Sequence, residues 1–239
     1  MTSAEPNRSR EALVPESGPS ASLATRGRIR AAVFDMDGLL IDTEPLWRAA
    51  EADLLERHGD RFTDADAEAT HGRSIQDTVE AYAERLGGLD VVAVRAELLS
   101  AMRAHYLAGP PLRPGAKPLI DALRGRLHLG VASNTDGDLV RIALESVGLL
   151  DAFEAIVSAA DVGRGKPSPD IYRAACERLG VEARHAVAFE DSPAGIRAAK
   201  AAGMSCIGVP DREAVDLEGA GADLVVGSLE DLVDLAWLE

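Results

Sequence analysis

Six short apolar runs, most of them separated by segments with helical spacing, constrain the fold of this chain more than any other feature. The runs are Ala31–Phe34, Leu127–Ala132, Phe153–Ser158, Ala186–Phe189, Ser205–Val209 and Leu224–Val226. Because they are continuous rather than alternating, they are typical of strands buried on both faces. Helical patterns cover Pro114–Arg124, Asp136–Val147, Pro169–Leu179 and Ser192–Ala202. The alternation predicts an α/β fold, a parallel sheet with helices on both faces.

The segment between the first two apolar runs breaks this alternation, because it contains helical patterns only. The patterns cover Glu44–His58, Ile75–Leu86 and Asp90–Leu107, and a Pro-rich segment, 109–114, leads back to the sheet. We therefore predict an all-helical domain at residues 44–110, inserted into a core that comprises residues 29–43 and 111–239. Residues 1–28 are rich in Ser, Pro, Arg and Glu without periodicity, and we interpret them as a disordered N-terminal tail.

Composition narrows the range of partners. The net charge of −15 and the lack of a Lys/Arg cluster argue against nucleic-acid binding, which needs a basic face. No apolar run approaches the roughly 20 residues that span a bilayer, and the start of the chain lacks the apolar segment of a secretory signal. The two cysteines have no CxxC spacing and are typical of reduced, buried thiols. We therefore expect a cytoplasmic protein that does not bind membranes. The sequence carries no signal for an oligomeric state, and a monomer is the default expectation.

Polar residues follow four of the apolar runs, where ligands bind in an open parallel sheet. They are Asp35 and Asp37 after the first run, Ser133 and Asn134 after the second, Lys166 in the loop after the third, and Glu190 and Asp191 after the fourth. Turn residues are common at strand ends, so each group alone is as compatible with a structural role as with a functional one. Their joint placement at one edge of the sheet predicts a shared site.

The residue types at this edge suit phosphoryl transfer. Asp35 can attack phosphorus and form an aspartyl-phosphate, which divides one difficult step into two easier ones. Asp37 points to the same side of an extended chain and can act first as general acid and then as general base. The hydroxyl of Ser133 and the amide of Asn134 suit phosphate oxygens. Lys166 supplies a fixed cation near the nucleophile.

The charges at this edge predict a metal ion. Glu190 and Asp191 are hard oxygen ligands of the kind that Mg²⁺ accepts, and with Asp35 and Asp37 they make up the predicted metal site. Four carboxylates and a single ammonium group, that of Lys166, would repel a phosphate dianion. Mg²⁺ would offset most of this excess and contact the transferring phosphoryl group directly. The sequence therefore predicts Mg²⁺ as the cofactor and a small phosphorylated metabolite as the substrate.

Four ordered segments of the chain resemble the motifs of a known family. The segments are Phe34–Gly38, Ser133–Asn134, Gly165–Asp170 and Phe189–Ile196. They are similar to the four motifs of the haloacid dehalogenase-like superfamily, and the fold-level similarity runs from Arg30 to the C-terminus. The resemblance implies a Rossmann-like core, a helical cap between the first two motifs and an aspartyl-phosphate mechanism. The family places a substrate-contacting loop in the cap, which makes Arg73 a candidate substrate-binding residue.

Within the superfamily, the segment Phe34–Trp47 is most similar to the hexitol phosphatase and 2-deoxyglucose-6-phosphatase group. This group belongs to a branch that also contains β-phosphoglucomutases, which resemble this chain in all four motifs. A sugar phosphomutase is therefore the alternative to a phosphatase that hydrolyses a sugar or polyol phosphate.

Two cap positions favour hydrolysis over mutase chemistry. Trp47 stands where those mutases usually carry a hinge histidine, and Ile75 where they usually carry an arginine that grips a distal phosphate. An indole cannot relay a proton at neutral pH, and an isoleucine cannot hold a second phosphate. Arg73 is near enough in sequence to substitute for the arginine, so the mutase alternative stays open.

Overall fold

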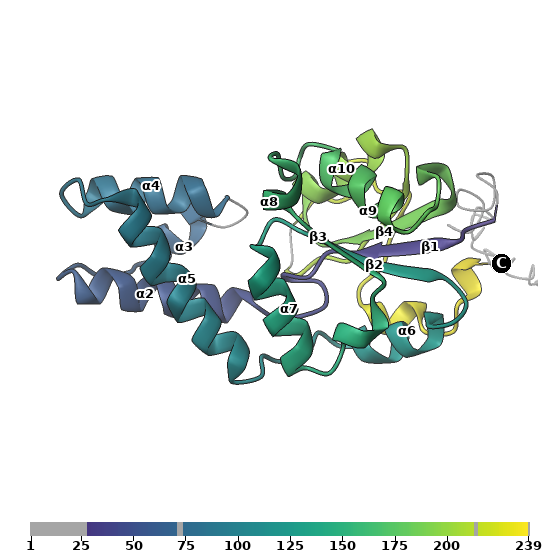
Figure 1. Ribbon diagram of the computed structural model, residues 1–239, viewed down its shortest axis with the longest axis horizontal. Helices are drawn as coiled ribbons and strands as arrows, with labels where there is room; N and C mark the ends of the chain where they lie inside the picture. The colour runs from purple at the N-terminus through teal and green to yellow at the C-terminus, as the bar shows by residue number, and fades with distance from the viewer. Residues whose placement is uncertain (1–27, 71–73, 213–214, 239) are drawn as a thin grey trace, which may run out of the picture.

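A six-stranded parallel sheet forms the centre of the molecule, as the apolar runs predict (Figure 1). The computed structural model describes residues 28–70, 74–212 and 215–238. The strands are β1 (Ala31–Phe34), β2 (His128–Ser133), β3 (Ala155–Ser158), β4 (Ala186–Glu190), β5 (Ser205–Gly208) and β6 (Leu224–Val225). Their order is β3-β2-β1-β4-β5-β6, and each strand lies within two residues of its predicted range. The predicted fold class, a Rossmann-like α/β sheet, is confirmed.

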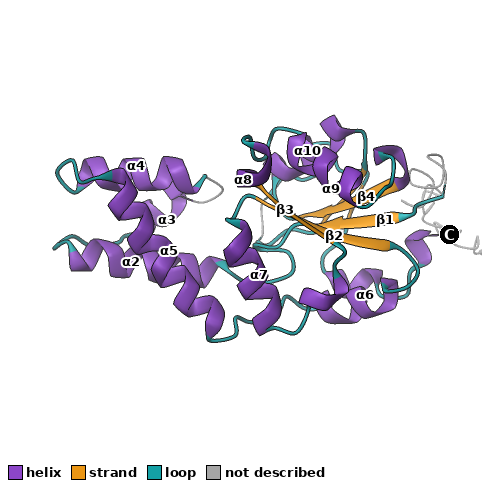
Figure 2. Ribbon diagram, in the orientation of Figure 1, coloured by secondary structure: helices purple, strands orange, loops and turns teal. Residues whose placement is uncertain are grey.

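Helices cover both faces of the sheet (Figure 2). One face carries α6 (Ala116–Leu123), α7 (Gly137–Ser146) and the short 3-10 helices η1 (Leu150–Ala152), η3 (Leu229–Leu232) and η4 (Ala236–Leu238). The other face carries α8 (Ala159–Val162), α9 (Asp170–Arg178), η2 (Ala183–His185) and α10 (Pro193–Ala202). Two hydrophobic clusters, one on each side of the sheet, therefore form the core.

The alternation of side chains along β1 sets the direction of the residue that follows it. Successive strand residues point to opposite faces, so Phe34 belongs to the cluster under α6 and α7, and Val33 to the cluster under α9 and α10. Phe34 is fixed by stacking on Phe189 of β4, with ring centroids 4.5 Å apart. Asp35 shares the parity of Val33 and therefore points to the side of α9 and α10.

Four helices lie between β1 and α6 in the chain and form a separate helical layer beyond the sheet (Figure 1). They are α2 (Glu44–Arg57), α3 (Asp64–Thr70), α4 (Ile75–Arg85) and α5 (Val91–Leu107), and we call them the cap. Local sequence explains two of their starts: the side chains of Ser74 and Asp90 accept hydrogen bonds from the first-turn amides of α4 and α5. The insertion is helical as expected, while its limits at residues 44 and 110 stay a prediction.

Helix α3 is the one cap helix in the described ranges that the sequence did not predict. It buries only Ala67, so it has no apolar stripe from which a helix could be recognised.

Residues 1–27 of the predicted tail, and Arg73, lie outside the described residues. Among the helices that are described, none combines the length and the apolar character needed to cross a bilayer. A cytoplasmic location and a monomeric state stay predictions.

Candidate active site

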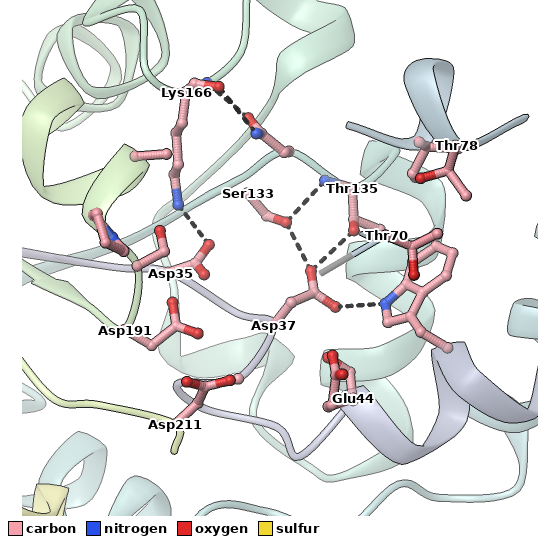
Figure 3. Close-up of a pocket in the computed structure, with 18 of the residues that line it drawn as sticks. Asp35, Asp37, Glu44, Thr70, Thr78, Ser133, Thr135, Lys166, Asp191 and Asp211 are labelled. Carbon is pink, nitrogen blue, oxygen red and sulfur yellow. Dashed lines mark hydrogen bonds and ion pairs between the residues drawn. The ribbon is translucent and has the colours of Figure 1, made fainter. Parts of the chain in front are cut away.

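A cavity of about 400 Å³ is lined by residues from the carboxyl ends of the strands and from the cap (Figure 3). Six of the predicted site residues line it: Asp35, Asp37, Ser133, Asn134, Lys166 and Asp191. Glu190 is fully buried and reaches the same cluster through Lys166. The structure therefore brings together every predicted site residue that it describes, from positions up to 156 residues apart in the chain.

Lys166 joins two of the predicted carboxylates. Its Nζ lies 2.5 Å from Oδ1 of Asp35 and 2.6 Å from Oε1 of Glu190, and its side chain is only 4% exposed. The ammonium group also lies 5.3 Å from the ring centroid of Tyr172 on α9, in cation–π geometry. Its two carboxylate partners raise the pKa of Lys166 against the opposing effect of burial, so it stays a cation.

The carboxylate of Glu190 is held on both of its oxygens. Oε1 accepts a hydrogen bond of 2.5 Å from the hydroxyl of Tyr172, and Oε2 accepts one of 3.1 Å from the hydroxyl of Ser192, which also caps the start of α10. Gly195 in the first turn of α10 makes room for it, because a Cβ there would lie 1.9 Å from the carboxylate. The segment after β4 thus supplies both the acid and the cradle that holds it.

Three carboxylates form a group suited to a metal ion. Asp35, Glu190 and Asp191 each offer an oxygen, and these oxygens lie within 4.8 Å of one another. Asp191 is buried against Gly38, whose missing side chain leaves space for Oδ2, and its Oδ1 has no hydrogen-bond partner among the described residues. An unpaired buried carboxylate oxygen is costly unless a cation or donor binds it.

The raised pKa values of Asp35 and Asp191 show that these buried carboxylates lack compensating positive charge. Burial raises the pKa of Asp35 to about 7, although Lys166 opposes the shift. Burial also raises the pKa of Asp191 well above its ordinary value, and Asp35 and Glu190 add to the effect. One ammonium group does not neutralise three buried carboxylates, so the residues fit a divalent cation with a preference for oxygen ligands, such as Mg²⁺.

The fourth predicted metal ligand, Asp37, has its side chain elsewhere. Its Oδ2 accepts hydrogen bonds from Ser133 (3.1 Å) and Thr135 (2.9 Å), and its Oδ1 accepts them from Tyr106 (2.9 Å) and Trp47 (3.5 Å). These donors turn the carboxylate away from the group formed by the three other acids (Figure 3). The side chain of Asp37 is thus held by hydroxyl and indole groups and not by the three-acid group, and a role for Asp37 as a metal ligand stays a prediction.

The two predicted phosphate-binding residues also position catalytic candidates. Ser133 is fully buried; its Oγ donates to Asp37 and accepts a hydrogen bond of 3.0 Å from the amide of Thr135. The side chain of Asn134 bonds the backbone of Lys166 twice, accepting at 2.8 Å from its N–H and donating at 3.3 Å to its carbonyl. Both residues line the cavity, as contact with a phosphate group would require. That contact stays a prediction for each.

Three residues at the site received no functional role from the sequence. Thr135 follows the Ser-Asn pair directly, and its position one residue beyond a strand-end motif was a usable signal. Tyr106, at the end of α5, lies 69 residues from Asp37 in the chain and had no local signal. Asp211 lines the cavity and contributes to the raised pKa of Asp191. It lies in an irregular segment after β5 that carries no motif.

Comparison with known proteins decides the family. A family model of haloacid dehalogenase-like hydrolases matches residues 29–203. The chain belongs to this family. It is 35% identical over 212 residues to validoxylamine A 7'-phosphate phosphatase of Streptomyces hygroscopicus subsp. limoneus, covering 87% of this chain and 96% of that protein. It is 34% identical over 215 residues to hexitol phosphatase B of Escherichia coli (strain K12), covering 88% of this chain and 97% of that protein.

A solved structure of the same family has the same architecture. CbbY of Rhodobacter sphaeroides, in complex with phosphate, matches with a TM-score of 0.77 at 32% identity, covering 85% of this chain and 96% of that chain. The haloacid dehalogenase-like family predicted from the four motifs is confirmed, and hexitol phosphatase B is among the relatives. The predicted enzyme class, a phosphoric monoester hydrolase, agrees with relatives that are named as phosphatases.

Proposed function

We propose that this hydrolase is a Mg²⁺-dependent phosphatase that cleaves a small sugar or polyol phosphate through an aspartyl-phosphate on Asp35. The observation that best supports this is that Asp35 and Asp37, only two residues apart in the chain, have different surroundings in the folded molecule. Asp35 lies with Lys166 and the metal-binding acids, whereas Asp37 lies among hydroxyl and indole donors. Two acids in distinct surroundings suit two distinct roles.

In the first step, an oxygen of Asp35 forms a bond to phosphorus while the bond between phosphorus and the ester oxygen breaks. Asp37 gives a proton to the departing oxygen, which leaves as an alcohol. The ion pair with Lys166 holds the Asp35 carboxylate in one orientation, since Nζ contacts Oδ1 from a loop that Asn134 fixes. The pairing also favours the ionised form of Asp35 that attack requires.

In the second step, water attacks the same phosphorus atom and the bond to Asp35 breaks. Asp37 takes a proton from this water, so both acids return to their starting state and inorganic phosphate is released. Asp35, Glu190 and Asp191 would hold Mg²⁺, which supplies positive charge for the phosphoryl oxygens. The hydrogen bonds from Ser133 and Thr135 give Asp37 one fixed position for both proton transfers.

The size of the cavity and the named relatives support a small substrate. A volume of about 400 Å³ lies in the range of small-molecule sites. One relative is named for a hexitol and another for validoxylamine A 7'-phosphate. We infer that the leaving group of this chain is of the same kind, a sugar or a polyol.

The phosphomutase alternative is less well supported by the cap side of the cavity. Trp47 and Ile75 both line the cavity in which we place the substrate. The indole N–H of Trp47 is directed at Asp37, where it can donate but cannot carry a proton away. A coupled assay of glucose 1-phosphate with a bisphosphate primer measures mutase activity; efficient conversion with little free phosphate would favour the mutase.

The covalent step is tested by rapid acid quenching with a radiolabelled phosphate ester. We expect wild-type protein with Mg²⁺ to retain label and to release inorganic phosphate, and the Asp35→Asn variant to do neither. The variant serves as the matched control because asparagine keeps the shape of the side chain but is a poor nucleophile. Hydrolysis without any labelled protein, under conditions in which label on a known aspartyl-phosphate enzyme survives, would contradict the mechanism.

A further inference from the structure

Helix α2 of the cap presents one face to the cavity. Glu44, Trp47, Arg48 and Glu51 all line it, with the three- and four-residue spacing that places side chains on one side of a helix. Trp47 donates to Asp37, and Arg48 pairs with Glu44 at 3.0 Å. Glu51 lies one turn beyond Trp47, and no salt bridge joins it to any residue that the structure describes.

Glu51 is an unusual residue to bury in this position. It is only 5% exposed, and among the described residues no lysine, arginine or histidine forms an ion pair with it. Its Oε2 accepts hydrogen bonds from the hydroxyl of Tyr82 (2.7 Å) and the hydroxyl of Thr70 (3.0 Å). Burial raises the pKa of Glu51, and these two hydrogen bonds oppose the rise. A buried carboxylate with neutral partners only is destabilising unless something else requires it.

The second oxygen of Glu51 is available to a ligand. Tyr82 and Thr70 both bond Oε2, and Oε1 accepts no hydrogen bond from the part of the chain that the structure describes. Since the residue lines the cavity, the two anchored bonds fix the carboxylate and leave one oxygen for a donor on the substrate. A side chain held in this way can discriminate between ligands, because it does not need to be ordered on binding.

The distance from the reacting atoms suits the distal part of a leaving group. Glu51 lies four positions after Trp47 on the helix, a rise of about 6 Å along the axis. Trp47 contacts Asp37, the acid that we propose protonates the ester oxygen. Glu51 therefore lies beside atoms several bonds further along the leaving group, where a sugar or polyol carries hydroxyl groups.

We propose that Glu51 is a specificity residue whose Oε1 accepts hydrogen bonds from hydroxyl groups of the leaving group. The inference rests on the proposed phosphatase function and adds the feature of the substrate that the cap recognises. A carboxylate can only accept hydrogen bonds, so it binds a chain of hydroxyl groups, gives nothing to an alkyl chain and repels a second phosphate or a carboxylate. Sites built to bind a hydroxyl group discriminate strongly against analogues that lack it.

The test compares two substrates that differ only in hydroxyl groups, a hexitol phosphate and n-hexyl phosphate. The quantity measured is the ratio of kcat/KM for the first to kcat/KM for the second, in Mg²⁺, for wild type, Glu51→Gln and Glu80→Gln. Glutamine keeps the shape of residue 51 and can still accept from Tyr82 and Thr70, but it turns an amide donor toward the cavity. Glu80 is an exposed cap glutamate outside the cavity that bonds Gln76 on the same helix, which makes it the matched control.

We expect the ratio to fall about ten- to hundredfold in Glu51→Gln and to be unchanged in Glu80→Gln, since a hydrogen bond to a charged group is lost. A Glu51→Gln protein that loses kcat/KM equally for both substrates, or for neither, would overturn the assignment. Tyr82→Phe, which removes one anchor of Oε2, should lower the ratio in the same direction by a smaller factor, and an unchanged ratio there would count against the anchoring. If wild type hydrolyses n-hexyl phosphate as well as the hexitol phosphate, Glu51 recognition is wrong while the phosphatase function stands. Hydrolysis of neither would refute the phosphatase function itself.

Discussion

The two sides of the cavity are built from different parts of the chain and by different interactions. On the core side, side chains from strand ends and from the loop after α8 meet through short charged contacts, such as that of Lys166 with Asp35 and Glu190. On the cap side, helix faces supply Trp47 and Tyr106, which reach the site through neutral donors. The comparison suggests that the core determines the reaction, while the cap tunes the acid and selects the leaving group.

The largest effect is expected for the nucleophile on the core side. Asp35→Asn should lower turnover by about a thousandfold or more, because the variant keeps its shape but cannot form the aspartyl-phosphate. Circular dichroism should show an unchanged fold. Activity within about tenfold of wild type, in protein free of deamidated product, would show that the core side does not work as described.

Removal of the metal should have an effect of similar size. Activity should vanish in EDTA and return with Mg²⁺, since three buried carboxylates then lose their compensating charge. Mg²⁺ should also raise the melting temperature of the resting protein, by mass action on the folded state. Asp191→Asn should reduce this rise, whereas Asp121→Asn, on the exposed side of α6, should leave it unchanged. Full activity in chelator would contradict the metal role.

The affinity for Mg²⁺ should depend on pH. The pKa of Asp35 in the metal-free protein is raised to about 7, so the group binds a proton below that pH, and this proton must leave when Mg²⁺ binds. Affinity should therefore fall by about tenfold for each pH unit below 7, and the raised pKa of Asp191 acts in the same direction. Calorimetric titration from about pH 5.5 to about pH 8, a range that includes this pKa, measures the dependence. The slope should flatten in Asp35→Asn, and an affinity independent of pH would show that both acids are already ionised.

The core side was largely predictable from the sequence, because topology alone brings its residues together. Asp35, Lys166 and Glu190 each follow a buried strand or its loop, and parallel strands place their ends at one edge. What the sequence could not give was the direction of a side chain after its strand ended. The carboxylate of Asp37 points to Ser133 and not to the three other acids, through contacts that exist only in the folded molecule.

The cap side was mostly unpredictable, because helix periodicity reports which face is apolar and not which polar residue points inward. In the sequence, Glu51 is one of several charged residues of α2. Its burial depends on contacts with Tyr82 and Thr70, which lie 31 and 19 residues away in the chain. Tyr106 likewise reads as a core residue of α5. Both depend on packing between elements, for which a single sequence carries no local signal.

A smaller effect is expected for the cap donors to Asp37. Tyr106→Phe removes the shorter bond, 2.9 Å, and should lower kcat about tenfold, while Trp47→Phe removes the 3.5 Å contact and should have less effect. Burial raises the pKa of Tyr106 well above its ordinary value, so its hydroxyl is a neutral donor in any such assay. Because Tyr106 positions Asp37, its loss should also shift the pH profile of kcat. A lower melting temperature with an unchanged kcat and pH profile would reduce Tyr106 to a packing role.

The smallest effect is expected for an ion pair that joins the cap to the core. Nη2 of Arg95 on α5 lies 2.8 Å from both carboxylate oxygens of Asp136 at the start of α7, and the side chains are 37% and 32% exposed. Exposed ion pairs contribute at most about 1 kcal/mol, because water and salt screen them. Arg95→Met should therefore change the free energy of unfolding, measured by urea denaturation, by no more than this and leave kcat/KM within about twofold.

Arg164→Met is the matched control for Arg95→Met, since Arg164 pairs with Asp170 at 2.8 Å within the core and away from the cap. The two variants should behave alike if the cap is held by packing and by the donors to Asp37. A loss of activity in Arg95→Met that Arg164→Met does not share would mean that this ion pair sets the position of the cap over the cavity. The cap would then act on the reaction through its placement as well as through Trp47 and Tyr106, and the division between the two regions would be less sharp.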